Sequence, residues 1–207
     1  MLPEDRDEAR SCISCSPHER SDMRDGLDRM VRYRRNFVPG GTYFFTLTLA
    51  DRRSSALVDH IDALRSAFRA ARGARPFAID AIVILPDHLH AIFTLPSNDA
   101  DFPGRWRRVK GHFSSAMIEA GLGLQRRPNG DLALWQRRFW EHTIRDESDF
   151  ARHVDYVHFN PVKHGLVQRV RDWPHSSFHR YVREGLLPDD WAGDAGENAE
   201  DFGEPSG

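Results

Sequence analysis

The chain has 207 residues, of which 40% are hydrophobic and 29% charged, so it is long enough for one globular domain with tails. Its formal net charge of −2 excludes a chain that is strongly basic or acidic throughout, and no apolar run reaches the length of a membrane-spanning helix. The N-terminus also lacks the apolar stretch of a secretion signal, so we expect a soluble cytoplasmic protein without a membrane partner.

The small net charge hides an uneven distribution along the chain. The first 30 residues and the last 20 are acidic, whereas residues 31–187 contain 24 Lys and Arg against 16 Asp and Glu. Nearly all of these cations are arginines, whose forked guanidinium groups match phosphate. We therefore expect a disordered N-terminal extension (1–30), one domain (31–187) that binds a polyanion, and a disordered acidic tail (188–207).

The extension contains both cysteines, Cys12 and Cys15, in a Cys-x-x-Cys spacing. A structural zinc site normally needs four ligands, so we interpret the pair as incidental. Met23 and Met30 are alternative candidates for the true start of the protein.

Residues 42–49 begin the ordered part of the chain. They are rich in aromatic and β-branched side chains and mostly alternate in character, which predicts a first strand. From Leu57 to Arg72, apolar residues recur at helical spacing between charged ones. This pattern predicts an amphipathic helix that ends at Gly73.

Two apolar runs follow, residues 77–85 and residues 88–95, separated by Pro86-Asp87. Their composition and the Pro-Asp turn signal predict a second and a third strand with a tight connection. A strand, a crossover helix and a strand hairpin together predict an α+β fold, with an antiparallel sheet and helices packed on one face.

The third predicted strand carries His88 and His90 on either side of Leu89. Because side chains alternate along a strand, both imidazoles point to one face of the sheet and Leu89 to the other. Two imidazoles side by side can bind one divalent cation, completed by a carboxylate or amide from another element. A half-exposed histidine pair without a metal is the alternative reading.

Residues 106–120 have the apolar spacing of a second helix. Arg105, Arg107, Arg108 and Lys110 crowd its predicted first turns, where positive charge is unfavourable for the helix dipole. A phosphate-binding patch would explain the cluster, and a solvated face is the alternative. Residues 132–140 then predict a short aromatic and basic strand or arm, suited either to base stacking or to core packing.

Residues 145–160 predict a third helix, capped by Asp146 or Ser148 and ended by Pro161. Tyr156 and Asn160 lie one turn apart on it. A tyrosine hydroxyl can attack a phosphodiester and hold the product as a phosphotyrosine. An amide oxygen beside it could bind the same cation as the two histidines. An ordinary amphipathic-helix tyrosine is the alternative.

Five segments of the chain carry a recognisable ordered set of residues. They are Tyr-Arg-Arg-x-Phe-Val-Pro-Gly-Gly-Thr-Tyr-Phe-Phe-Thr (33–46), Leu-Pro-Asp-His-Leu-His (85–90), Leu-Trp-Gln-Arg-Arg-Phe-Trp (134–140), Tyr-Val-His-Phe-Asn-Pro-Val-Lys-His-Gly-Leu-Val (156–167) and Asp-Trp-Pro-His-Ser-Ser-Phe (172–178). Together they resemble the REP-associated tyrosine transposases, within the single-tyrosine HUH transposase superfamily. The resemblance covers roughly residues 31–182.

The resemblance implies a ferredoxin-like α+β core of the HUH endonuclease type. The family's two histidines fall on His88 and His90, its nucleophile on Tyr156 and its third metal-binding position on Asn160, with His153 as a possible substitute. It implies a metal-dependent strand transferase that uses Mg²⁺ or Mn²⁺ and forms a 5′-phosphotyrosine link. The expected partner is single-stranded or hairpin DNA, with no small-molecule substrate, and the protein is expected to be a monomer or weak dimer.

Contacts to the DNA backbone are expected from basic residues of the domain. The candidates are Arg34, Arg35, Arg107, Arg108, Lys110, Arg137, Arg138 and Lys163. Two other functions remain open: a nucleic-acid-binding regulator that keeps the fold but cuts nothing, and a structural domain without a nucleic-acid role.

Overall fold

The computed structural model describes residues 35–128, 130 and 132–191. The expected extension (1–30), Arg34 and the part of the expected acidic tail after Trp191 lie outside the described residues. Among the described helices, none is long and apolar enough to cross a lipid bilayer.

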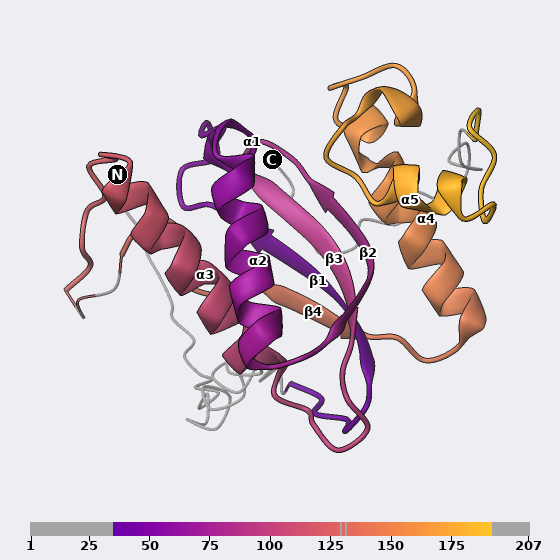
Figure 1. The fold of residues 1–207 in the computed structure, drawn as a ribbon, viewed down its shortest axis with the longest axis horizontal. Coiled ribbons are helices and arrows are strands. Elements are labelled where there is room, and N and C mark those ends of the chain that lie inside the picture. Colours follow the sequence, from indigo (N-terminus) through magenta and orange to yellow (C-terminus); the bar gives the residue numbers. More distant parts are fainter. Residues whose placement is uncertain (1–34, 129, 131, 192–207) are drawn as a thin grey trace, which may run out of the picture. The chain divides into compact units, whose positions relative to one another are not determined.

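A four-stranded antiparallel sheet forms the centre of the fold (Figure 1). Its strands are β1 (Thr42–Thr48), β2 (Ala78–Ile84), β3 (His88–Thr94) and β4 (Trp140–Thr143). They lie in the order β2-β3-β1-β4, and every neighbouring pair is antiparallel. The third strand is therefore an interior strand, hydrogen-bonded on both sides.

The helices connect and cover these strands. They are α1 (Ala56–Asp59), α2 (Ile61–Ala74), α3 (Phe102–Glu119), α4 (Glu147–Lys163), the short 3₁₀ helix η1 (Val170–Asp172) and α5 (Phe178–Arg183). The order β1-α2-β2-β3-α3-β4 is that of a ferredoxin-like unit, with α4 added after it. The predicted α+β class with an antiparallel sheet is confirmed.

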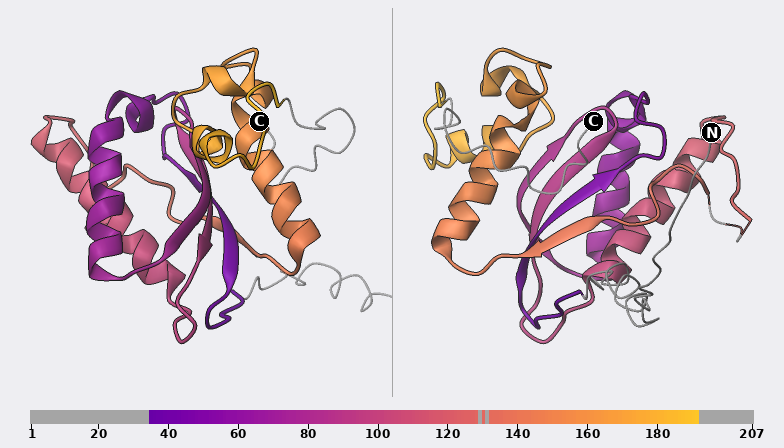
Figure 2. Two further views of the ribbon diagram at one scale, coloured as in Figure 1. Left: turned by 45° about the vertical axis from the view of Figure 1, so that its right-hand side comes forward. Right: turned by 180° about the vertical axis from the view of Figure 1, so that it is seen from behind.

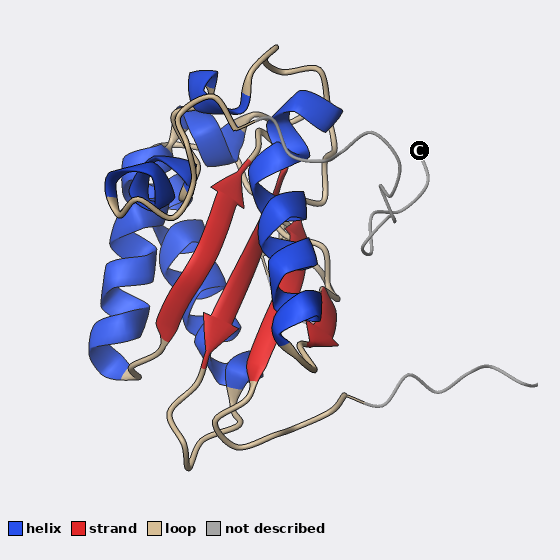
Figure 3. Cartoon of the chain, turned by 90° about the vertical axis from the view of Figure 1, so that its right-hand side faces the viewer, coloured by secondary structure: helices blue, strands red, loops and turns tan. Residues whose placement is uncertain are grey.

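The expected packing of helices on one face holds for α2 and α3, while α4 lies on the other face (Figure 2). Figure 3 shows α4 across the strands on that second face. The reason is visible in β1, where Phe45 and Leu47 join the core under α2 and α3, but Phe44 joins a second cluster under α4. Both faces of the sheet are apolar, so both need a cover.

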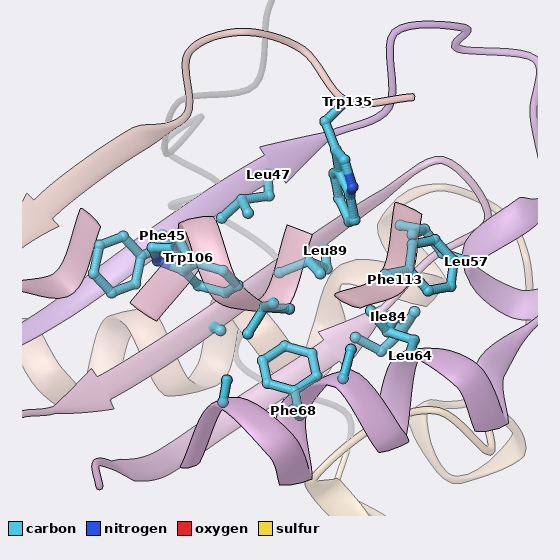
Figure 4. Close-up of a cluster of buried hydrophobic side chains, with 14 of the residues drawn as sticks. Phe45, Leu47, Leu57, Leu64, Phe68, Ile84, Leu89, Trp106, Phe113 and Trp135 are labelled. Carbon is cyan, nitrogen blue, oxygen red and sulfur yellow. The ribbon is translucent and has the colours of Figure 1, made fainter. Parts of the chain in front are cut away.

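The larger core cluster lies between the sheet and the α2–α3 layer (Figure 4). The indole of Trp106 stacks on Phe93 with ring centroids 4.6 Å apart, and Phe45 and Phe68 meet the same indole edge-on. Ring pairs of this kind contribute beyond the apolar area they bury. This packing of α2 and α3 stabilises the sheet whose other face carries the candidate site.

Several element boundaries differ from the sequence-based prediction. The predicted helix from Leu57 is divided at His60 into α1 and α2. The helix predicted from residue 106, α3, begins at Phe102, because the Asp101 carboxylate accepts a hydrogen bond from the Gly104 amide (2.8 Å) and caps an earlier start. Arg107 and Arg108 therefore lie beyond the first turn, and the predicted conflict with the helix dipole is wrong for them. Arg105 is in the first turn, but it is buried and pairs with Asp99 at 3.0 Å, so it is not part of an exposed phosphate-binding patch.

Two further boundaries shift in the second half of the chain. The α4 helix continues past Pro161 to Lys163, whereas the prediction ended it at the proline. A proline removes one backbone hydrogen bond, which the last turn of a helix tolerates. The regular strand predicted over 132–140 is limited to β4 from Trp140 onward, and Trp135 makes only an isolated bridge to Leu49.

Candidate active site

The histidine pair lies on the central strand β3, on the sheet face that α4 covers. The rings of His88 and His90 are buried, with centroids 5.1 Å apart. Their common direction follows from the strand period of two, with Leu89 in the opposite core as predicted. The structure thus brings the two predicted imidazoles together.

Neighbouring side chains orient both rings. The Nδ1 atom of His88 donates to Asp87 Oδ1 at 2.8 Å, and Arg52 Nε lies 2.8 Å from the other oxygen of that carboxylate. The Nδ1 atom of His90 is 2.9 Å from Thr46 Oγ1 on the adjacent strand. With Nδ1 engaged in each ring, Nε2 is the nitrogen that would bind a cation.

The Asp87 carboxylate is anionic in this arrangement. Burial alone would raise its pKa, but the hydrogen bond from His88 and the nearby charges of His88 and Arg52 lower the pKa below its ordinary value. An anion at this place favours the tautomer of His88 that carries its proton on Nδ1.

Tyr156 projects from α4 toward the histidine pair. Its ring is 5.2 Å from the His90 ring and 5.8 Å from Phe44, and its exposed fraction is 8%. The Nζ atom of Lys163 lies 3.4 Å from the tyrosine hydroxyl. Two elements far apart in the sequence thus meet at one point, and they bring the candidate nucleophile beside the two candidate metal ligands.

Asn160 is fully buried one turn after Tyr156 on α4. Its backbone carbonyl accepts the His164 amide at 3.0 Å, which closes the end of the helix. The His164 ring in turn lies edge-on to His88, with centroids 5.0 Å apart. An amide oxygen together with two imidazoles would be a mixed donor set, of a kind that suits Mn²⁺ better than Mg²⁺.

His153, the possible substitute for Asn160, belongs to a different cluster. Its ring stacks on His142 at 4.7 Å, and its Nδ1 atom donates to the Asp149 carbonyl at 2.7 Å. The ligand atoms of His142, Asp149 and His153 all lie within 4.8 Å of one another, so this group could hold a cation. In the structure, the Asp149 carboxylate accepts from His142 Nε2 (2.8 Å) and from the Arg145 amide (3.0 Å), and it ties α4 to β4.

The candidate DNA contacts fall into distinct groups. Exposed residues are Arg107 and Arg108 on α3 and Arg137 and Arg138 on the segment before β4. These two segments adjoin, because Lys110 Nζ donates to the Gln136 carbonyl at 2.9 Å. They lie on the α3 side of the sheet, whereas Tyr156 is on the α4 side.

Other candidates have partners within the protein. Arg35 pairs with Glu141 at 3.3 Å and lies 4.4 Å over the Phe139 ring. Burial lowers the pKa of Lys110 to about 8, and its ammonium group faces the Trp135 ring at 5.5 Å. Trp135 itself is buried in the core, so core packing is the outcome for this residue.

Sequence reasoning missed the residues that orient the site: Thr46, Arg52, Asp87 and His164. The strand register that pairs Thr46 with His90 was not visible in any local pattern. Asp87 stands next to His88 in the sequence and could have been proposed as its partner. For Lys163, the spacing of seven residues from Tyr156 was the available signal, since it is two helical turns.

The chain is similar to proteins that carry names and to a solved structure. No protein-family model matches the chain. Over 165 residues it is 49% identical to an Escherichia coli protein named REP-associated tyrosine transposase, a match that covers 80% of this chain and 93% of the relative. A Haemophilus influenzae relative that carries the same family name is 46% identical over 166 residues, which covers 79% and 94% of the two chains.

A solved structure matches over most of the fold. It is a REP-associated tyrosine transposase bound to a REP hairpin, and it aligns with a TM-score of 0.75 at 46% identity. The match covers 86% of this chain and 99% of that chain.

Proposed function

The chain belongs to the REP-associated tyrosine transposase family, and from this premise we propose that it nicks and rejoins single-stranded hairpin DNA of the REP type through a 5′-phosphotyrosine link. The observation that carries the proposal is the contact of Tyr156 with His90, whose ring lies beside that of His88. A buried nucleophile next to two metal-binding imidazoles is the arrangement that such chemistry needs.

In the proposed reaction, Tyr156 Oη attacks the scissile phosphorus and forms an O–P bond. The bond from phosphorus to the 3′ oxygen breaks, the tyrosine gives up its proton, and the leaving strand ends in a 3′-hydroxyl. Attack by the 3′-hydroxyl of another strand on the phosphotyrosine reverses these steps and joins the two strands. The low exposure of Tyr156 supports this reversibility, because it keeps water away from the covalent link.

The proposed cofactor is Mn²⁺ or Mg²⁺, which Nε2 of His88 and of His90 and the side-chain oxygen of Asn160 would hold. The bound cation supplies Lewis-acid stabilisation of the charge that develops on the scissile phosphate. The mixed nitrogen and oxygen donors favour Mn²⁺ of the two.

For the DNA backbone, the proposal rests first on the exposed arginines: Arg107, Arg108, Arg137 and Arg138. Arg35 and Lys110 would contact phosphate only by leaving their present partners, and Arg34 remains a candidate outside the described residues. Lys163 would meet the phosphate nearest to Tyr156. We place the activity in the cytoplasm, on nucleoid DNA, with a monomer or weak dimer as the working form.

The test uses single-stranded hairpin oligonucleotides from the DNA that flanks the gene, incubated with Mn²⁺ and resolved on a denaturing gel. We expect a metal-dependent protein–DNA adduct that is absent from Tyr156→Phe and His88→Ala. The matched controls are Tyr181→Phe, which changes a tyrosine bonded to the Asp80 carbonyl, and His112→Ala on the exposed side of α3. Both should form the adduct.

Hairpin binding by every variant, without an adduct from the unmodified protein, would contradict the nuclease and favour a regulator that binds the same DNA. Loss of both binding and adduct would leave a structural domain as the remaining reading.

A further inference from the structure

We propose that Lys163 is a catalytic residue, whose ammonium group stabilises negative charge on the Tyr156 oxygen during both cleavage and rejoining. The inference rests on the proposed function and gives this lysine a role other than a contact to the DNA backbone. The Nζ atom of Lys163 is 3.4 Å from Tyr156 Oη and 4.9 Å from the centroid of the tyrosine ring. Both distances place the cation on the reacting oxygen's side of the ring.

The helix itself holds the two side chains together. Tyr156 and Lys163 are seven residues apart, which is two helical turns, so both lie on one side of α4. This requires α4 to continue through Pro161, as it does. Had the helix ended at the proline, as the sequence pattern predicted, nothing would align the lysine with the hydroxyl.

The end of α4 is closed tightly around Lys163. The amides of His164, Gly165 and Leu166 donate to the carbonyls of Asn160, Val162 and Pro161 at 2.9–3.0 Å. Gly165 has a φ of +66°, a left-handed conformation that favours glycine. These hydrogen bonds fix the backbone on both sides of Lys163, so the position of its Cα atom relative to Tyr156 is fixed as well.

The chemistry needs a cation at this oxygen in both directions. When Tyr156 attacks, its O–H bond breaks and charge builds on Oη before the O–P bond is complete. When an incoming 3′-hydroxyl attacks the phosphotyrosine, the P–Oη bond breaks and Oη leaves with negative charge. An ammonium group within hydrogen-bonding reach stabilises Oη at both stages, and the loss of such a donor typically slows a reaction by about 100-fold.

Lys163 could also act in two simpler ways, which the experiment has to distinguish from catalysis. A lysine in the last turn of a helix interacts favourably with the helix dipole, and a lysine near DNA neutralises a phosphate. The dipole role would appear as lower thermal stability, and the phosphate role as weaker binding with a smaller salt dependence. Only the catalytic role slows adduct formation at saturating DNA with stability and binding retained.

The experiment measures single-turnover adduct formation with a hairpin oligonucleotide and Mn²⁺, at saturating DNA. We expect Lys163→Met to slow adduct formation by about 100-fold, and Lys163→Arg to stay within about tenfold of the unmodified protein because it keeps the charge. The matched control is Arg152→Met, which removes an exposed cation one turn before Tyr156 on the same helix. It should leave the rate unchanged.

A second reaction measures rejoining. The adduct is isolated and mixed with a strand that carries a free 3′-hydroxyl, and Lys163→Met should slow strand release as strongly as cleavage. A normal adduct rate in Lys163→Met at saturating DNA would overturn the inference and leave Lys163 as a backbone contact. Equal losses in Lys163→Met and Lys163→Arg would overturn the role of its charge. Absence of an adduct from the unmodified protein would instead refute the proposed function, and this inference with it.

Discussion

Asp87 links the candidate metal ligands to the rest of the protein. One of its carboxylate oxygens accepts a hydrogen bond from His88, and the other pairs with Arg52 in the loop after β1. Asp87 therefore connects Arg52 to the His88 imidazole. Partners of this kind hold a ligand ring in one orientation and raise its basicity. We therefore assign Asp87 a positioning role toward His88.

The expected effect of Asp87→Asn is a loss of metal affinity of about 10- to 100-fold, because the amide no longer provides an anion to orient the ring. Titration calorimetry with Mn²⁺ measures the affinity directly, without DNA. Asp51→Asn, which changes an exposed carboxylate near Arg53, is the control and should bind Mn²⁺ normally. Unchanged affinity in a folded Asp87→Asn variant would rule out the positioning role.

At this scale the sequence predicted the pair but not its surroundings. The alternation of a strand is enough to put His88 and His90 on one face. Thr46 reaches the His90 ring only because β1 pairs with β3 in one register, and Arg52 reaches Asp87 only because the loop after β1 folds back. Such contacts depend on pairing between distant segments, which a local pattern does not contain.

The α4 helix is the element that carries Tyr156, the candidate nucleophile, and its start is held in place by Asp149. The Asp146 side chain caps the Asp149 amide at 2.8 Å, and the Asp149 carboxylate binds His142 of β4. Burial alone would raise the pKa of Asp149, but hydrogen bonds from His142 and from Arg145 lower the pKa well below its ordinary value. The charged carboxylate thus stabilises the folded state.

The sign of the pH dependence follows from this lowered pKa. Above a pH of about 4, the carboxyl group is ionised in both folded and unfolded chains, and its stabilisation is fully present. Below that, the unfolded chain takes up the proton first, and the stabilisation is lost as the pH falls toward the folded pKa.

We expect Asp149→Asn to lower the free energy of unfolding by about 2–4 kcal/mol near neutral pH. In this variant, His142 and the Arg145 amide would donate to a neutral amide oxygen instead of a charged carboxylate. The difference from the unmodified protein should shrink as the pH falls below about 4. Urea denaturation at several pH values measures both quantities. A difference that stays constant across this range would mean that the charge of Asp149 is not the source of its contribution.

Element ends were the weakest part of the sequence-based prediction. Pro161 indicated a stop, yet α4 loses only one amide hydrogen bond there and continues to Lys163. For α3, the apolar spacing from Trp106 hid an earlier start that depends on Asp101. One boundary depends on a single capping side chain and the other on a single missing hydrogen bond. The periodicity of apolar residues contains no information about either.

At the scale of the whole molecule, the sheet lies between the candidate active-site residues and the exposed arginines. Its α4 face holds the histidines and Tyr156, and its α3 side holds the exposed arginines of α3 and of the segment before β4. The sequence predicted the fold class and which residues of the candidate site would come together, but it offered no way to tell which side of the sheet each charge would occupy. A DNA substrate that touches both groups must pass around the edge of the sheet.

Removing the four exposed arginines together (Arg107, Arg108, Arg137 and Arg138, each to Ala) should weaken hairpin binding and make it less sensitive to salt. Each lost phosphate contact should reduce the slope of log K against log salt by about 0.7–0.9. Fluorescence anisotropy over a salt series provides the slope. Arg65→Ala/Arg69→Ala, on exposed positions of α2, is the control, and equal slopes for all three proteins would exclude the α3 side as a DNA surface.

The interior position of β3 also limits how the chain can change in length. The strand pairs residue by residue with β1 from His88 to Thr94, and with β2 from Leu89 to Thr94 except for one register shift between Ile79 and Ala81. Because the side-chain period of a strand is two, one residue inserted or deleted beside His88 would turn the imidazoles into the aromatic core and bring Leu89 to Tyr156. The spacing of the hairpin is therefore as important to the candidate site as the histidines themselves, and we expect a one-residue insertion or deletion in β3 to disrupt the site even with all of its side chains retained.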